Sequence, residues 1–274
     1  MKNSGPIGVF DSGYGGLTVL KELMNKMPEH DFIYFGDNAR APYGTRSFDV
    51  VYEYTLQAVK ELFRRGCPLV ILACNTASAK ALRTIQQRDL QHLDPDNRVL
   101  GVIRPTTELI GSISTKKHIG ILATEGTVKS NSYEIEVQKF NPEVKVHQHA
   151  CPIWVPLIET GMHFTKPGKK FIVKDVKALL KQSSKIDTIL LACTHYPILQ
   201  DYIQSMVPEG VSVISQGEIV ADSLIDYLER HPEMEERLIK GSKVEYLTSG
   251  DVETFDAKAL ELVGLEVQST QIHL

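Results

Sequence analysis

LVILACNTAS, residues 69–78, is the stretch that decides how the rest of the chain is interpreted. Its branched apolar residues end abruptly at Cys74, Asn75 and Thr76, and an apolar run bounded by turn-forming residues is typical of a buried strand. Residues 188–197, TILLACTHYP, repeat the pattern and place Cys193 in the same local position. The sequence therefore predicts two matched thiols, each at the end of a buried strand.

A second pair of matching segments indicates an internal duplication. Residues 7–13 (IGVFDSG) match residues 119–126 (IGILATEG) at an offset of 119 − 7 = 112, and the two cysteines lie 193 − 74 = 119 residues apart. Apolar strands alternate with amphipathic helices along the chain, which is the pattern of parallel sheets with helices on both faces. We predict an α/β fold of two similar, doubly wound, mainly parallel-sheet domains related by pseudo-twofold symmetry, with the active site in the cleft between them.

Polar residues gather at the carboxyl ends of the predicted strands, where ligands bind in such sheets. Asp11 opens the glycine-rich loop at residues 11–16, whose backbone amides suit a carboxylate or a phosphate. Asp37 follows the strand expected at residues 32–35, and Tyr43 and Gly44 form the next turn. The loop has neither the dinucleotide glycine spacing nor a P-loop Gly-Lys-Ser/Thr. A simple glycine turn capped by Asp11 remains the alternative.

Composition narrows the class of protein. The formal charge is −4, and no run of basic residues interleaved with aromatics is present, so we expect no nucleic-acid partner. No apolar run approaches the ~20 residues of a membrane span, and the N-terminal residues lack a leader pattern, so we expect a cytoplasmic protein without a membrane partner. The four cysteines form no CxxC pair, which predicts free thiols and no metal site.

The paired thiols suggest a reaction. A thiol at the start of a helix has its pKa lowered by the helix dipole, so Cys74 and Cys193 could each act as a base or a nucleophile, with His195 exchanging protons beside the second. Two thiols on opposite sides of a cleft can remove a proton from one face of a carbon and return one to the other face. The stereocentre is then inverted without a cofactor or a metal.

Several motifs in fixed order resemble the signature segments of the glutamate racemase family, within the cofactor-independent aspartate/glutamate racemases. The resemblance spans nearly the whole chain, as far as the TSGD segment at residues 248–251. The motifs that carry it are Asp11-Ser12-Gly13 with Gly15-Gly16-Leu17-Thr18-Val19, Pro42-Tyr43-Gly44, Cys74-Asn75-Thr76-Ala77-Ser78, Gly126-Thr127 with Ser130 and Tyr133, Glu159, and Cys193-Thr194-His195-Tyr196-Pro197.

The resemblance implies interconversion of L- and D-glutamate, with D-glutamate supplied to peptidoglycan, and a homodimer. It implies that Cys74 acts on the D-enantiomer and Cys193 on the L-enantiomer. It also implies a discontinuous first domain, residues 1–98 and 212–274, around a second domain at residues 99–211. The residues it assigns to assisting proton transfer are Asp11, Asp37, Glu159 and His195, and those it assigns to substrate binding are Asp11, Ser12, Tyr43, Gly44, Asn75, Thr76, Thr194 and His195.

Three other functions fit part of the pattern. A racemase for aspartate would use the same thiols, and a one-methylene difference in substrate is worth only ~1 to 3 kcal/mol. Cys193 with His195 could instead catalyse acyl transfer, although this leaves Cys74 without a role. A small-molecule binding protein of two α/β lobes would explain the amide-rich loops but not the paired thiols. Two cysteines that merely pack at strand ends are the structural alternative.

Overall fold

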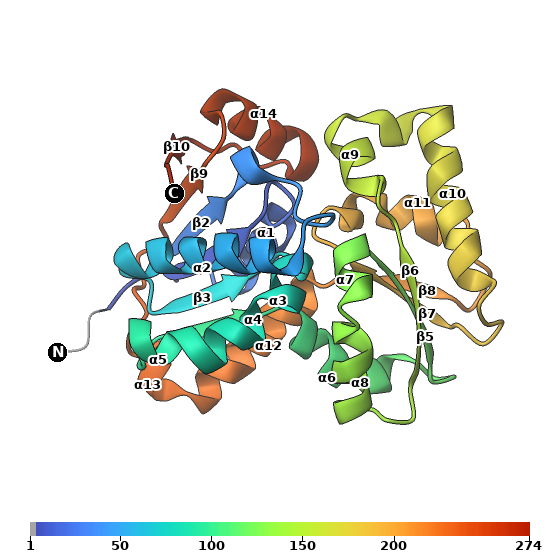
Figure 1. Cartoon of the computed structure of the whole chain (residues 1–274), viewed down its shortest axis with the longest axis horizontal. Coiled ribbons are helices and arrows are strands. Elements are labelled where there is room, and N and C mark those ends of the chain that lie inside the picture. Colours follow the sequence, from blue (N-terminus) through green and yellow to red (C-terminus); the bar gives the residue numbers. More distant parts are fainter. Residues whose placement is uncertain (1–3) are drawn as a thin grey trace.

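The computed structural model describes residues 4–274 and contains two parallel sheets, one in each of two lobes (Figure 1). The six-stranded sheet has the order β10-β9-β2-β1-β3-β4, and the four-stranded sheet has the order β6-β5-β7-β8. Every strand pair in both sheets is parallel. The predicted α/β fold with two parallel sheets is confirmed.

The strands are short and mostly buried. Their bounds are β1 Ile7–Asp11, β2 Phe32–Gly36, β3 Leu69–Leu72, β4 Arg98–Gly101, β5 His118–Ala123, β6 Lys145–Ala150, β7 Thr188–Ala192, β8 Ser212–Ile214, β9 Val244–Thr248 and β10 Ser269–Gln271. The α-helices are α1 Leu17–Lys26, α2 Phe48–Arg64, α3 Asn75–Lys80, α4 Leu82–Thr84, α5 Leu90–Leu93, α6 Ile103–Ile113, α7 Glu125–Lys129, α8 Ser132–Phe140, α9 Trp154–Glu159, α10 Lys166–Leu180, α11 Gln200–Gln204, α12 Gly217–Arg230, α13 Pro232–Glu235 and α14 Val252–Val263.

Helices cover both faces of the larger sheet because successive strand residues point to opposite sides. Val9 and Ile71 pack on one side with α1, α12 and α14, whereas Phe10 and Leu72 pack on the other with α2 and α3. The second sheet is built in the same way, between α9 and α10 on one side and α6 and α8 on the other. Fully apolar strands such as β3 are the expected result of burial on both faces.

The two sheets share one strand order. The order β2-β1-β3-β4 corresponds position by position to β6-β5-β7-β8, and β9 and β10 extend only the first sheet. Strand β1 therefore corresponds to β5 and β3 to β7, which are the two pairs that match in sequence. Cys74 lies two residues beyond β3, and Cys193 lies directly after β7. The two thiols therefore follow corresponding strands of the two sheets.

Several details differ from the sequence interpretation. The sequence pattern predicts one helical stretch over residues 127–140, but the structure divides it into α7 and α8, because Asn131 has the left-handed φ of 53°. The sequence pattern also predicts a helix from about residue 77 to residue 90, but the helical segment begins at Asn75 and is interrupted by a π-helical turn at Ile85–Asp89. Strand β4 pairs with β3, and β8 pairs with β7, so sheet pairing puts residues 99–101 in the first lobe and 212–214 in the second.

The chain crosses between the lobes twice, after β4 and after β8, and its C-terminal helices return to the first lobe (Figure 1). Residues 1–3 lie outside the described residues. They begin the predicted first domain and belong to the N-terminal stretch in which no leader is expected. In the part of the chain from residue 4 onward, no helix has the length and apolar character needed to span a membrane.

Candidate active site

A cavity opens where the carboxyl ends of the two sheets face each other. Both predicted thiols, Cys74 from the first lobe and Cys193 from the second, line its wall. Most of the other predicted site residues line it as well, namely Ser12, Tyr43, Gly44, Asn75, Thr76, Glu159, Thr194 and His195. Asp11 and Asp37 are buried behind this wall and do not line it.

The Cys74 sulfur is held by the loop after β1 and by its own helix. Its thiol donates to Ser12 Oγ at 3.5 Å, and the Ala77 backbone N–H donates to the sulfur at 3.5 Å as the N-cap interaction of α3. In the thiolate form the Ser12 hydroxyl can donate to the sulfur instead, and both contacts then lower the pKa of Cys74. Burial and the nearby Asp11 carboxylate act against them and raise the pKa of Cys74 to about 11.

The Cys193 thiol has a similar environment in the second lobe. Burial raises its pKa well above the ordinary value, and the Cys74 and Asp11 charges add to this effect, while the His195 backbone N–H lowers it. No α-helix begins here, because Cys193 is followed by a turn and the 3-10 helix Tyr196–Leu199. The expectation that helix dipoles lower both thiol pKa values is therefore wrong, because desolvation by burial is the larger effect and raises both.

The raised pKa of Cys74 predicts a specific loss of stability at high pH. A group that binds its proton more tightly in the folded state stabilises that state fully below its unfolded pKa, near 9, and loses this contribution as pH rises to about 11. For a two-unit shift the loss is on the order of 3 kcal/mol. Urea unfolding at pH 8 and pH 11 should show this extra loss in the parent but not in Cys74→Ser. Equal losses in the two proteins would contradict the assignment.

Asp11 connects the two lobes from behind the cavity wall. Its carboxylate accepts from the Gly13 backbone N–H at 2.9 Å and from Thr194 Oγ1 of the second lobe at 3.2 Å. Burial raises the pKa of Asp11, and the charge of nearby His195 lowers it. His195 Nε2 lies 2.9 Å from Glu159 Oε1, which makes an imidazole and carboxylate pair on the wall itself. This pair can hold or pass a proton at the cavity surface.

Asp37 is used differently from the other predicted acids. Its two carboxylate oxygens accept hydrogen bonds from Tyr43 Oη at 2.5 Å, Arg40 Nε at 2.6 Å and Ser249 Oγ at 2.6 Å. Only Tyr43 of this group faces the cavity. The geometry therefore gives Asp37 the task of orienting Tyr43, because Asp37 does not line the cavity itself and reaches it through the Tyr43 hydroxyl.

Asn75 and Thr76 are fixed by residues of the second lobe. Asn75 Oδ1 accepts from Tyr133 Oη at 2.5 Å, and Tyr133 Oη in turn accepts from Gln216 Nε2 at 2.9 Å. Gln216 Nε2 also lies 2.9 Å from the Val102 carbonyl, so one side chain links the two segments that cross between the lobes. Sequence reasoning missed Gln216, because a single glutamine before a helix has no distinctive signal.

Thr76 Oγ1 lies 2.9 Å from Thr124 Oγ1, which caps α7 in the second lobe. Thr124 and Glu125 also line the cavity and were not among the predicted site residues. Their signal in the sequence is present, because Thr124 and Glu125 directly follow β5, as Ser12 directly follows β1. The duplicated pattern could have identified both residues.

Comparison with known proteins agrees with this geometry. Residues 17–224 match the family model for Asp/Glu/Hydantoin racemase. The chain is 40% identical over 271 residues to the glutamate racemase of Ruegeria sp. (strain TM1040), covering 95% of this chain and 97% of that protein.

Solved structures agree as well. A glutamate racemase isoform of Bacillus anthracis has 33% identity and a TM-score of 0.89, and the match covers 100% of this chain and 99% of that one. The glutamate racemase of Francisella tularensis, solved with D-glutamate, has 29% identity and a TM-score of 0.84 over 100% of this chain and 98% of that one. This chain is a racemase that belongs to the Asp/Glu/Hydantoin racemase family.

Proposed function

We propose that this chain interconverts L-glutamate and D-glutamate by a two-base reaction in which Cys74 and Cys193 work from opposite faces of the α-carbon. The observation that carries the proposal is the placement of two thiols, from equivalent positions of the two lobes, on the wall of one cavity. The names of the relatives supply the substrate, and one of them was solved with D-glutamate.

In the proposed reaction one thiolate removes the α-proton and the opposite thiol donates its proton to the other face of the resulting carbanion. By the family resemblance, Cys74 deprotonates D-glutamate and Cys193 deprotonates L-glutamate. The buried sulfurs suit this step, because a thiolate of raised pKa is a stronger base toward a weakly acidic C–H bond. The substrate ammonium would offset the Asp11 charge that disfavours the thiolate.

The remaining residues take binding and supporting roles in this proposal. Cavity-lining hydroxyl, amide and backbone groups hold the substrate, from Ser12, Tyr43, Gly44, Asn75, Thr76, Thr194 and His195. His195 and Glu159 assist proton exchange at Cys193, because their side chains form a pair on the wall next to it. Asp11 acts through Thr194 and Asp37 acts through Tyr43, so we place both as positioning residues.

Substrate choice between glutamate and aspartate is tested by racemisation of each amino acid without added cofactor. We expect the kcat/KM for glutamate to exceed that for aspartate by at least ~10-fold, since one methylene in a fitted pocket is worth ~1 to 3 kcal/mol. Circular dichroism of the amino acid follows both reactions. Activity on aspartate alone would contradict the proposed substrate.

The finer features of the proposal rest on the family resemblance. They are a reaction without a cofactor, a cytoplasmic homodimer, a supply of D-glutamate for peptidoglycan, and a division near residues 98 and 211 into a discontinuous and an inserted domain. Rescue of a bacterial strain that requires D-glutamate tests the supply role, and analytical ultracentrifugation tests the dimer.

A further inference from the structure

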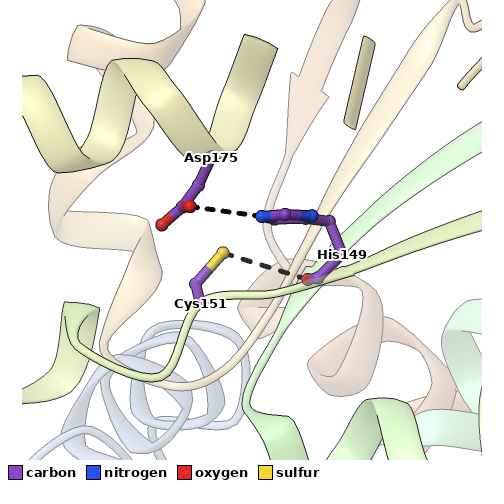
Figure 2. A group of neighbouring side chains, drawn as sticks. All are labelled: His149, Cys151 and Asp175. Carbon is purple, nitrogen blue, oxygen red and sulfur yellow. Dashed lines mark hydrogen bonds and ion pairs between the residues drawn. The ribbon is translucent and has the colours of Figure 1, made fainter. Parts of the chain in front are cut away.

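A second cluster of reactive side chains lies in the second lobe. His149 is in β6, Cys151 follows the end of that strand, and Asp175 comes from the middle of α10 (Figure 2). Residues two apart on a strand point to the same side, which brings the histidine and the cysteine together under the helix. Figure 2 shows the three side chains turned toward one another.

The ligand atoms of this cluster are close enough to share one ion. One ring nitrogen of His149, Cys151 Sγ and one Asp175 oxygen all lie within 4.8 Å of one another, and His149 Nε2 is 3.2 Å from Asp175 Oδ1. Ligand atoms around a tetrahedral zinc ion are roughly 3.3 to 3.8 Å apart, given metal–ligand bonds of about 2.0 to 2.3 Å. Small side-chain movements would therefore close the cluster on an ion.

The surroundings of the cluster also suit a metal ion. Trp154 Nε1 donates to Asp175 Oδ2 at 2.8 Å, which occupies one carboxylate oxygen and directs the other toward His149. Such an outer hydrogen bond orients metal-binding carboxylates. The side chains of His149 and Asp175 are 25% and 15% exposed, which gives an ion access, while Cys151 is only 1% exposed.

We propose that His149, Cys151 and Asp175 form a site for a thiophilic divalent cation, with Zn²⁺ as the best fit. One thiolate, one imidazole and one carboxylate are ligand types that zinc prefers, and three protein ligands leave a fourth position for water. Binding releases the Cys151 thiol proton to solvent and forms a metal–sulfur bond. The sequence shows no metal-binding motif here, because the third ligand lies 175 − 151 = 24 residues beyond the second.

The proposed metal site takes no part in the proposed racemisation, but it lies close to the residues that do. Cys151 also lines the candidate active-site cavity. Its backbone carbonyl accepts a hydrogen bond at 3.0 Å from the hydroxyl of Tyr196, a residue that lies three positions beyond Cys193. The cluster and the two proposed catalytic thiols are therefore neighbours, and a binding test must separate them. Replacement of both Cys74 and Cys193 by serine removes the competing thiols and leaves the cluster in place.

The experiment titrates Co²⁺, a spectroscopic substitute for Zn²⁺, into the full chain carrying Cys74→Ser and Cys193→Ser. We expect a near-ultraviolet charge-transfer band from one thiolate–cobalt bond, saturating at one equivalent and reversed by Zn²⁺. Adding Cys151→Ser should abolish the band, and adding His149→Ala or Asp175→Asn should weaken binding by at least ~10-fold. Adding Cys67→Ser is the matched control and should leave the band unchanged, since Cys67 packs in the first lobe.

His149→Ala keeps the test decisive if Cys151→Ser does not fold, because the histidine is partly exposed. A missing band, or a band that persists in both the His149→Ala and Cys151→Ser backgrounds, would overturn the proposal. His149 and Asp175 would then be only a hydrogen-bonded pair, with the Cys151 thiol donating to the His149 carbonyl. Racemisation by the parent chain is measured separately, so failure of this site leaves the proposed function untouched.

Discussion

Cys74→Ser and Cys193→Ser should each lower racemisation of glutamate by at least ~10²-fold in kcat, in both directions. In the proposed mechanism each turnover uses one cysteine as base and the other as acid, so loss of either sulfur interrupts both directions. A serine hydroxyl is a far weaker acid than a thiol and is not ionised near neutrality. Cys67→Ser is the matched control, because Cys67 is equally buried but does not line the cavity.

Each single variant should retain the half of the chemistry that its remaining cysteine performs. With a β-chloro substrate, the remaining thiolate removes the α-proton and chloride leaves, so no second acid is needed. Cys74→Ser should then act on the L-enantiomer and Cys193→Ser on the D-enantiomer, as chloride release would show. Racemisation within a few-fold of the parent by either variant would contradict the two-thiol mechanism.

Gly15→Ala should lower kcat/KM by about 10²-fold, although Gly15 does not line the cavity. A Cβ at this position would lie 2.4 Å from His195 Nδ1 and 2.5 Å from Thr194 Oγ1. Since Thr18 Oγ1 also donates to the Thr194 carbonyl at 2.9 Å, the glycine loop of the first lobe packs directly on the residues after Cys193. The added methyl group must therefore displace His195, Thr194 or the loop.

Gly13→Ala is the control for this substitution. It lies in the same loop, but a Cβ there would meet its nearest atom, Asn38 Nδ2, at 3.5 Å, which is an ordinary contact. We expect it to lose several-fold less activity than Gly15→Ala. Steady-state kinetics and urea unfolding of both variants separate displacement of the site from loss of stability. Equal activity in the two variants would mean that the loop does not position His195.

Much of this fold could be predicted because its strands are buried on both faces. Continuous apolar runs such as β3 and β7 are visible without any tertiary information, and their duplication predicted two similar sheets. The short β10 and the break at Asn131 were not predicted, because an exposed strand and a single left-handed residue leave weak signals. The crossing points between lobes depend on strand pairing, which local patterns do not specify.

The sequence could predict which types of residue make up the candidate site, but not the pKa shifts of their side chains. Strand ends identified Cys74 and Cys193, because polar residues after apolar runs are conspicuous in the sequence. The direction of the pKa shift depends on how deeply each sulfur is buried and on the approach of Asp11, both of which are tertiary properties. The hydrogen bonds of Asp37 are likewise a tertiary property, because its partner Ser249 lies 249 − 37 = 212 residues away.

The most direct test of the central claim is racemisation in deuterated water, stopped at a few per cent conversion. If two opposed thiols act, the product enantiomer carries deuterium from the second thiol, which exchanges with solvent, while the unreacted enantiomer keeps hydrogen. L- and D-glutamate used in turn as the starting enantiomer should give the same result. Product that retains the substrate hydrogen, or equal early labelling of both enantiomers, would indicate a single base and contradict the account.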